Sequence, residues 1–99
     1  FASGWTEPQP TQNLTSIAIA EATGQITITY PTRAGGGTLV LVPTSLSGNA
    51  QAALTVGTPP AGGNIIWTCY AAGKTAPTGG VGPTAAGTLA AKHAPAECR

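Results

Sequence analysis

Two short segments in which apolar and polar residues alternate form the clearest local pattern in this chain. Residues 14–21 (LTSIAIAE) and 25–30 (QITITY) both place isoleucines at every second position. Alternation with a period of two is typical of a half-buried β-strand. Residues 22–24 (ATG) form a short link whose glycine tolerates a positive φ, and Pro31 ends the second segment. The pattern therefore predicts an antiparallel hairpin.

Two more strands are predicted after a flexible connection at residues 34–37 (AGGG). Residues 38–42 (TLVLV) are apolar on both faces, which indicates a strand covered on both sides, and we expect Pro43 to stop it. Residues 64–70 (NIIWTCY) form the last strong strand, whereas residues 52–56 are a weaker candidate. Four consecutive strands favour a four-stranded antiparallel sheet, so the expected fold class is mainly β.

The two ends of the chain show less regular alternation of apolar and polar residues. Residues 1–13 predict a leading arm, and residues 14–99 predict one head with its sheet within residues 14–70. The tail at 71–99 is mostly Gly, Ala, Pro and Thr, which is too poor in large side chains to fold alone. No segment predicts a useful amphipathic helix, and residues 85–92 offer at most a turn or two.

The alternation gives the sheet one strongly apolar face. Such a face packs against a second sheet or a helix, and the sequence predicts neither, so we expect a cover from outside these residues. In the third strand the pattern leaves open whether Leu39 or Val40 lies on this face. The residues of the candidate face are Ile17, Ile19, Ile26, Ile28, Leu39, Leu41, Ile65 and Trp67.

Composition limits the size of the core. Leu, Ile, Val and Phe together make 17 of the 99 residues, below the fifth of the chain that an ordinary core uses. Only seven residues are charged, which excludes the high net charge of a disordered chain. The long apolar periods of a helical bundle or a coiled coil are absent. With these classes excluded, the composition is that of a small β-domain.

Charge is sparse and balanced, with a formal net charge of +1. The four Lys and Arg residues are scattered, which excludes the basic footprint of a nucleic-acid-binding protein. No charged residue occurs from 34 to 73, and near-zero net charge favours association, as in a subunit that polymerises. No run of 18 apolar residues occurs, so no membrane span is predicted.

Cys69 and Cys98 are the two cysteines of the chain. In a small chain with a modest core, an even number favours one disulfide and an oxidising compartment; two free thiols in a cytosolic protein are the alternative. Closing a loop of roughly 30 residues contributes about 3.7 kcal/mol in the chain-entropy model. The chain starts at Phe1 rather than Met and shows no signal peptide, so we expect a processed N-terminus.

Residues that could carry catalysis or bind a metal are few. Glu7, Glu21 and Glu97 form no pattern for acid–base catalysis, and His93 is the single histidine. A metal site needs three or four ligands. The glycine clusters lack the Lys-Ser/Thr ending of a phosphate-binding loop. We therefore expect no enzymatic activity, no metal and no cofactor.

Three motifs and the C-terminal ending resemble the globular domain of bacterial type IV pilins, specifically the type IVa group. The motifs are residues 24–30 (GQITITY), 38–43 (TLVLVP) and 63–69 (GNIIWTC), and the ending is residues 94–99 (APAECR). Their order, with one cysteine after the tryptophan strand and one at the C-terminus, carries a resemblance that covers residues 14–99.

The resemblance implies a four-stranded antiparallel sheet lying on the C-terminal half of a long N-terminal helix. It also implies that Cys69 and Cys98 bound a disulfide loop, residues 69–98, and that the apolar face is the helix-docking face. The hydrophobic N-terminal helix of the family is absent from this sequence. Either the chain is a fragment of a longer pilin, or the pilin is split and the helix is a separate short polypeptide, which we favour.

The function expected from the resemblance is a structural subunit of an extracellular pilus, assembled with other pilin subunits after a periplasmic stage. Such filaments serve motility, adhesion, DNA uptake or extracellular electron transfer; no CxxCH haem motif occurs here. The alternative is a small secreted β-module that binds a carbohydrate or another ligand as a monomer, with Trp5 or Tyr70 on an exposed platform. Trp67 alternates with apolar neighbours, so we expect it in a core.

Overall fold

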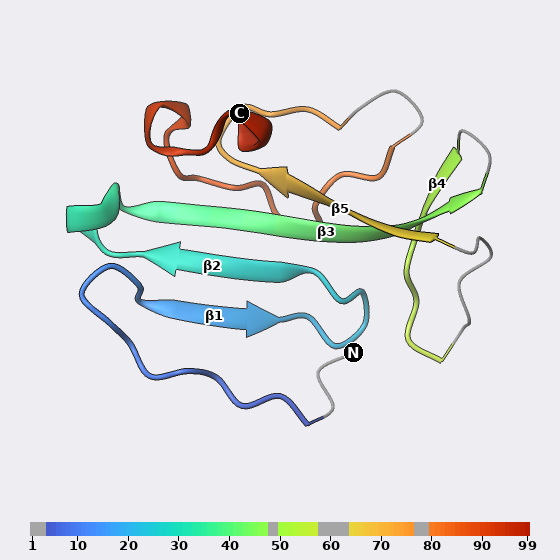
Figure 1. The fold of residues 1–99 in the computed structure, drawn as a ribbon, viewed down its shortest axis with the longest axis horizontal. Helices are drawn as coiled ribbons and strands as arrows, with labels where there is room; N and C mark the ends of the chain where they lie inside the picture. The colour runs from blue at the N-terminus through green and yellow to red at the C-terminus, as the bar shows by residue number, and fades with distance from the viewer. Residues whose placement is uncertain (1–3, 48–49, 58–63, 77–79) are drawn as a thin grey trace.

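The computed structural model describes residues 4–47, 50–57, 64–76 and 80–99 as one antiparallel sheet with a C-terminal segment packed around it (Figure 1). Within the sheet, β1 pairs with β2 and β2 with β3, and β3 pairs in addition with β4 and β5. The prediction of a mainly β, antiparallel fold is confirmed. The five strands are β1 (Ser16–Ile19), β2 (Ile26–Tyr30), β3 (Gly37–Ser47), β4 (Ala50–Ala53) and β5 (Asn64–Tyr70).

The helical content of the described residues is three single 3-10 turns, η1 (Thr32–Ala34), η2 (Ala91–His93) and η3 (Ala96–Cys98). The first turn, followed by glycines at 35–37 with positive φ, takes the place of the predicted flexible connection. The second begins within residues 85–92, where at most a turn or two was expected, and ends one residue beyond them. In the described parts of the chain, no helix has the length and hydropathy needed to cross a membrane.

The predicted hairpin of β1 and β2 is confirmed. Ile17 lies opposite Ile28 and Ile19 opposite Ile26, so the alternating isoleucines share one face. The turn closes where the Gly24 N–H donates to the carbonyl oxygen of Ala20 at 2.8 Å, and Gly24 adopts a φ of 76°. A side chain at this φ would be strained, which accounts for the glycine.

The prediction that Pro43 stops the third strand is wrong, because β3 runs on to Ser47. Pairing with β2 ends at Leu41 and pairing with β4 begins at Thr44, so one edge of β3 has no partner at Pro43. Successive residues of a strand direct their backbone groups to opposite edges. The Thr38 carbonyl oxygen accepts from residues 88–89, on the edge of β3 that faces β5. Pro43 is an odd number of residues further along the strand, so its nitrogen points to the opposite edge, which has no partner there. No ladder hydrogen bond is lost there.

Register across the strands separates the side chains into two faces, which we call the Leu39 face and the Val40 face. Residues directly opposite each other in an antiparallel pair lie on the same face. Leu39 belongs to one buried cluster, whereas Val40, Val42 and Tyr70 form another. Leu39 and Val40 are 6% and 2% exposed, which confirms that this strand is covered on both sides.

Residues 80–84 lie against the Val40 face. The Tyr70 hydroxyl donates to the carbonyl oxygen of Val81 at 3.2 Å. The buried Gln25 side chain accepts from both the backbone N–H and the hydroxyl of Thr84, at 3.0 and 3.2 Å. These contacts place residues 80–84 beside the face that carries Tyr70.

The C-terminal segment then crosses the sheet to the Leu39 face. The N–H groups of Thr88 and Leu89 donate to the Thr38 carbonyl oxygen at 3.0 and 2.9 Å, and the Ala72 N–H donates to the Leu89 carbonyl oxygen at 2.9 Å. Residues 88–89 therefore separate the start of β3 from the chain that follows β5. Gly87 makes the crossing possible, because a Cβ there would collide with the carbonyl oxygen of Tyr70.

Candidate docking face of the sheet

All eight residues of the predicted apolar face lie on the Leu39 face. The strand register arranges this face in rows that run across the strands. Each row consists of residues that lie directly opposite one another on neighbouring strands. The rows are Ile17, Ile28 and Leu39; then Ile19, Ile26, Leu41 and Cys69; then Pro43 and Trp67; and finally Ser45 and Ile65.

Leu39 and Ile28 of the first row are covered by the chain itself, which corrects the expectation that the cover comes from outside these residues. Leu39 packs in a buried cluster with Leu89, Ala94 and Cys98, and Ile28 packs against this cluster. Leu89 is 2% exposed. We call this part of the face the covered half. Leu39 and Ile28, both expected to contact a helix, already have partners within the chain.

The other part of the face, which we call the open half, consists of Ile19, Ile26, Pro43, Ile65 and Trp67 and is hollowed by a pocket of about 200 Å³. Trp67 is 54% exposed and Ile65 is 42% exposed, so the prediction that Trp67 lies in a core is wrong for this chain by itself. No residue that lines the pocket is charged or carries a polar side chain. The lining residues are Ile19, Gly24, Ile26, Pro43, Leu54, Ile65 and Trp67.

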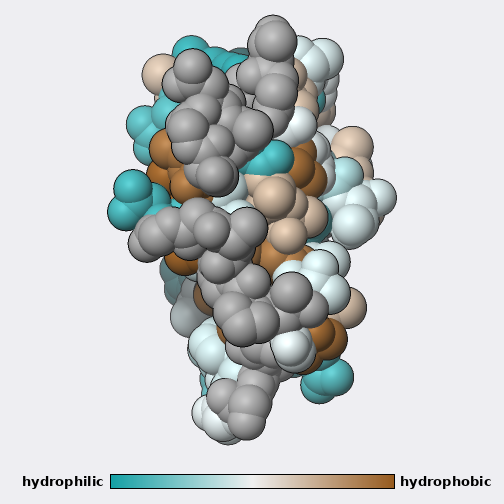
Figure 2. All heavy atoms as spheres, turned by 90° about the vertical axis from the view of Figure 1, so that its right-hand side faces the viewer, coloured by the Kyte–Doolittle hydropathy of each residue, from teal (hydrophilic) through white to brown (hydrophobic). Residues whose placement is uncertain are grey.

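Strands β3, β4 and β5 carry no charged side chain, since none occurs in residues 34–73. Figure 2 shows the end of the molecule around β4 and the start of β5, where hydrophobic residues reach the surface among pale and hydrophilic ones. Val56, at 56% exposure, is a further large apolar side chain in this region. The apolar surface of the open half therefore has no charged rim from β3, β4 or β5.

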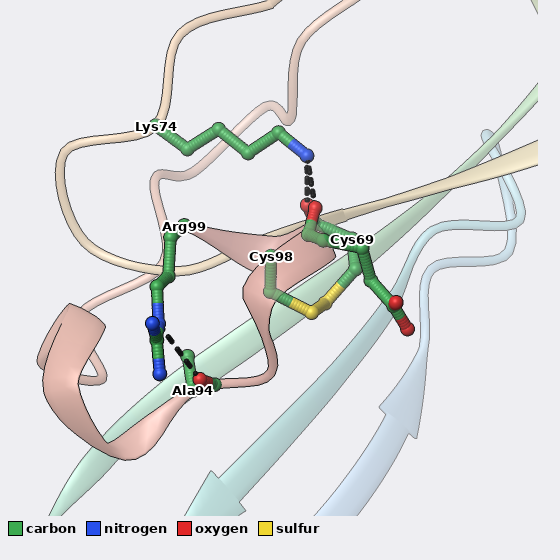
Figure 3. The surroundings of a disulfide bond; sticks show 6 residues. Cys69, Lys74, Ala94, Cys98 and Arg99 are labelled. Carbon is green, nitrogen blue, oxygen red and sulfur yellow. Dashed lines mark hydrogen bonds between the residues drawn. A yellow bond between two sulfur atoms is a disulfide. The ribbon is translucent and has the colours of Figure 1, made fainter.

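The disulfide predicted from the cysteine count is present and joins Cys69, near the end of β5, to Cys98 in η3 (Figure 3). The two Cα atoms are 4.7 Å apart. The backbone supports the same junction, because the Ala71 N–H donates to the Cys98 carbonyl oxygen at 2.7 Å. The expectation that the tail is held as a loop against the last strand is confirmed.

Lys74 links the two sides of the disulfide loop. Its Nζ donates to the Cys69 carbonyl oxygen at 2.9 Å and to the Glu97 carbonyl oxygen (Figure 3). The same ammonium lies 5.2 Å from the centre of the Tyr70 ring, within the range of a cation–π interaction. Figure 3 also shows Arg99, whose Nε donates to the Ala94 carbonyl oxygen at 3.0 Å.

Tyr70 is buried, and burial raises the pKa of its phenol above the usual value of 10.0. At 1% exposure it offers no platform for a ligand, so the expectation that Tyr70 serves a secreted binding module is wrong. Trp5, the other residue suggested for that role, is 41% exposed.

The chemistry-bearing residues considered in the sequence analysis lie apart from the pocket. Among the described residues, no cluster of three or more His, Cys, Asp or Glu side chains has the proximity to hold a metal ion. Glu7 and Glu97 are exposed, as is His93 in η2, and the two cysteines are joined to each other.

Several residues that build this site were not identified from the sequence. Leu89 is the single large side chain of the tail that enters the Leu39 cluster, and its isolation among small residues was the one available signal. Gly87, which permits the crossing, resembled any other glycine of a Gly-rich tail. The pairing of Gln25 with Thr84 spans 59 residues and has no local signature.

Comparison with known proteins shows the family that this chain resembles. A family model described as Pilin (bacterial filament) matches residues 2–99. No curated protein and no solved structure matches the chain.

Proposed function

The chain belongs to the pilin family of bacterial filament proteins, and we propose that it is a type IVa pilin head whose open half packs on a pilin N-terminal helix in a cell-surface pilus. The family consists of structural filament subunits rather than enzymes. The finer part of the proposal concerns the cover of the sheet. The helix comes either from a separate short chain or from a segment of the same pilin.

The observation that carries this proposal is the exposed apolar surface around Trp67. Trp67 and Ile65 are 54% and 42% exposed beside a pocket with no charged or polar side chain in its lining. A contiguous exposed apolar surface marks a protein interaction site. An apolar helix face would bury these side chains and requires no charged partner.

A split pilin is the arrangement we favour, and intact masses distinguish the possibilities. Filaments sheared from the source cells are purified and all subunits are weighed. A mass for this chain together with a short hydrophobic polypeptide supports two chains per pilin. A single longer subunit ending in this sequence supports one chain. Absence of this sequence from every filament contradicts the proposal.

A secreted binding module is the second candidate, and the exposure of Trp67 beside the pocket is the observation that favours it. An indole ring of this kind is able to stack on a sugar. Titration with mono- and oligosaccharides, followed by tryptophan fluorescence, tests this candidate. A saturable shift supports it, and its retention in a Trp67→Ala variant contradicts a role for this face.

A further inference from the structure

We infer that the C-terminal segment 87–98 and the docked helix divide the Leu39 face between them, and that this segment fixes the position of the helix along the strands. The inference rests on the proposed function, since it takes the occupant of the open half to be one pilin helix. It adds an intramolecular occupant of the other half.

The segment is held on the covered half near both of its ends. At its start, residues 88–89 bond to Thr38 and Ala72 within the plane of the sheet. The Leu89 side chain also packs beside Leu39, and the Leu89 Cα and Cδ1 lie 2.8 Å from the positions that Cβ atoms at Gly37 and Gly35 would occupy. Those glycines leave the space that the leucine fills, so the covered half is built to receive this segment.

At its end, the segment is tied to the sheet by the disulfide. Cys69 lies in the same row as Ile19, Ile26 and Leu41. Ile19 and Ile26 line the pocket, whereas Cys69 packs against the covered cluster. The disulfide therefore stands on the boundary between the two halves, and it prevents the segment from moving into the open half.

The open half defines the kind of helix that it accepts. Five of the lining residues come from β1, β2, β3 and β5, and Gly24 and Leu54 lie in the links after β1 and β4, so the pocket runs across the strands. Four strands span three intervals of about 4.8 Å, or about 14 Å. A helix rises 1.5 Å per residue, so the contact covers about ten residues. We expect an apolar stripe of three turns, at spacings i, i+3 or i+4, and i+7, with no charge in it.

Disulfide formation precedes correct docking in this arrangement. A disulfide oxidant of the thiol–disulfide exchange class takes two electrons and two protons from the cysteine thiols, and its own disulfide becomes a dithiol while the Cys69–Cys98 bond forms. In the dithiol chain, segment 87–98 is held by hydrogen bonds and packing alone. Its departure would uncover Leu39 and Ile28 and offer the helix a second position.

Carbene footprinting with tandem mass spectrometry tests the division, on the isolated chain and on purified filaments. We expect labelling of Ile65 and Trp67 to fall at least threefold in filaments, while labelling of residues 89–98 and of Leu39 stays unchanged. A rise in labelling of residues 89–98, together with protection of Trp67, overturns the division and leaves the proposed function standing. Unchanged labelling of Trp67 overturns both.

A second measurement on the isolated chain tests the role of the disulfide without any partner. A Cys69→Ala/Cys98→Ala variant should show labelling of Leu39 and Ile28 that is at least threefold higher than in the oxidised chain. Val56, which is 56% exposed, is the internal control and should not change. Equal labelling of Leu39 in the two proteins overturns the assignment of the disulfide as the lock.

Discussion

Leu89 is the side chain on which the covered half depends most, so the Leu89→Ala variant is the sharpest test of the packing. Leu89 is 2% exposed and contacts Leu39, Ala94 and Cys98. Truncating a buried leucine to alanine costs about 2–5 kcal/mol, and the cost is larger where the site cannot collapse. The disulfide and the sheet backbone hold the walls of this site, so we expect a loss of about 3 kcal/mol in the free energy of unfolding.

Urea denaturation of the oxidised chain, followed by circular dichroism, measures this loss as a lower midpoint at an unchanged slope. In thermal unfolding, each kcal/mol lowers Tm by about 4–8 °C in a domain of this size, so Tm should fall by about 12–24 °C. Val56→Ala is the matched control, because Val56 is 56% exposed, and it should change the stability by no more than about 0.5 kcal/mol. A loss below about 1 kcal/mol for Leu89→Ala would refute the described packing.

Three further changes probe the crossing, the disulfide and the buried phenol. Gly87→Ala should lower stability by about 1–3 kcal/mol or prevent folding, because its Cβ meets the Tyr70 carbonyl oxygen; a stability equal to that of wild type in urea denaturation would contradict the crossing. Cys98→Ser should cost about 2–5 kcal/mol and raise amide exchange over residues 87–98; unchanged exchange would contradict the lock. The raised pKa of Tyr70 means that the folded chain keeps a proton which the unfolded chain releases above pH about 10. Stability should therefore be unaffected by this group below pH 10 and should fall as the pH rises towards the pKa of the folded chain. Between pH 9 and 11, the urea midpoint should fall less in Tyr70→Phe than in wild type. An equal fall in the two proteins would exclude the Tyr70 phenol as the cause.

The strands were predictable because their signal is local. The hairpin of β1 and β2 follows from alternating isoleucines and one glycine, and β5 has the predicted residues 64–70. The extension of β3 beyond Pro43 was not predictable, since it depends on where β2 ends and β4 begins. A proline is excluded from a strand only where a neighbouring strand would need a hydrogen bond from the backbone N–H that proline lacks.

The residues that share the candidate face were predictable from the sequence, but which of them the chain itself covers was not. Alternation assigns Ile17, Ile19 and Trp67 to one face, because a period of two needs no knowledge of tertiary contacts. The covered half depends on a segment that lies about 50 residues after β3 in the chain. The Leu89 N–H of this segment donates to the Thr38 carbonyl oxygen of β3. Long-range pairing of this kind leaves almost no trace in a tail of small residues.

Burial of Trp67 on assembly is the central claim, and one measurement tests it most directly. A Trp5→Phe variant makes Trp67 the single tryptophan, so acrylamide quenching of its fluorescence reports on the open half alone. We predict strong quenching in the isolated chain, where Trp67 is 54% exposed, and quenching reduced several-fold in filaments assembled from the variant. Equal quenching in the two states would show that the open half stays bare in the filament and would contradict helix docking on this face.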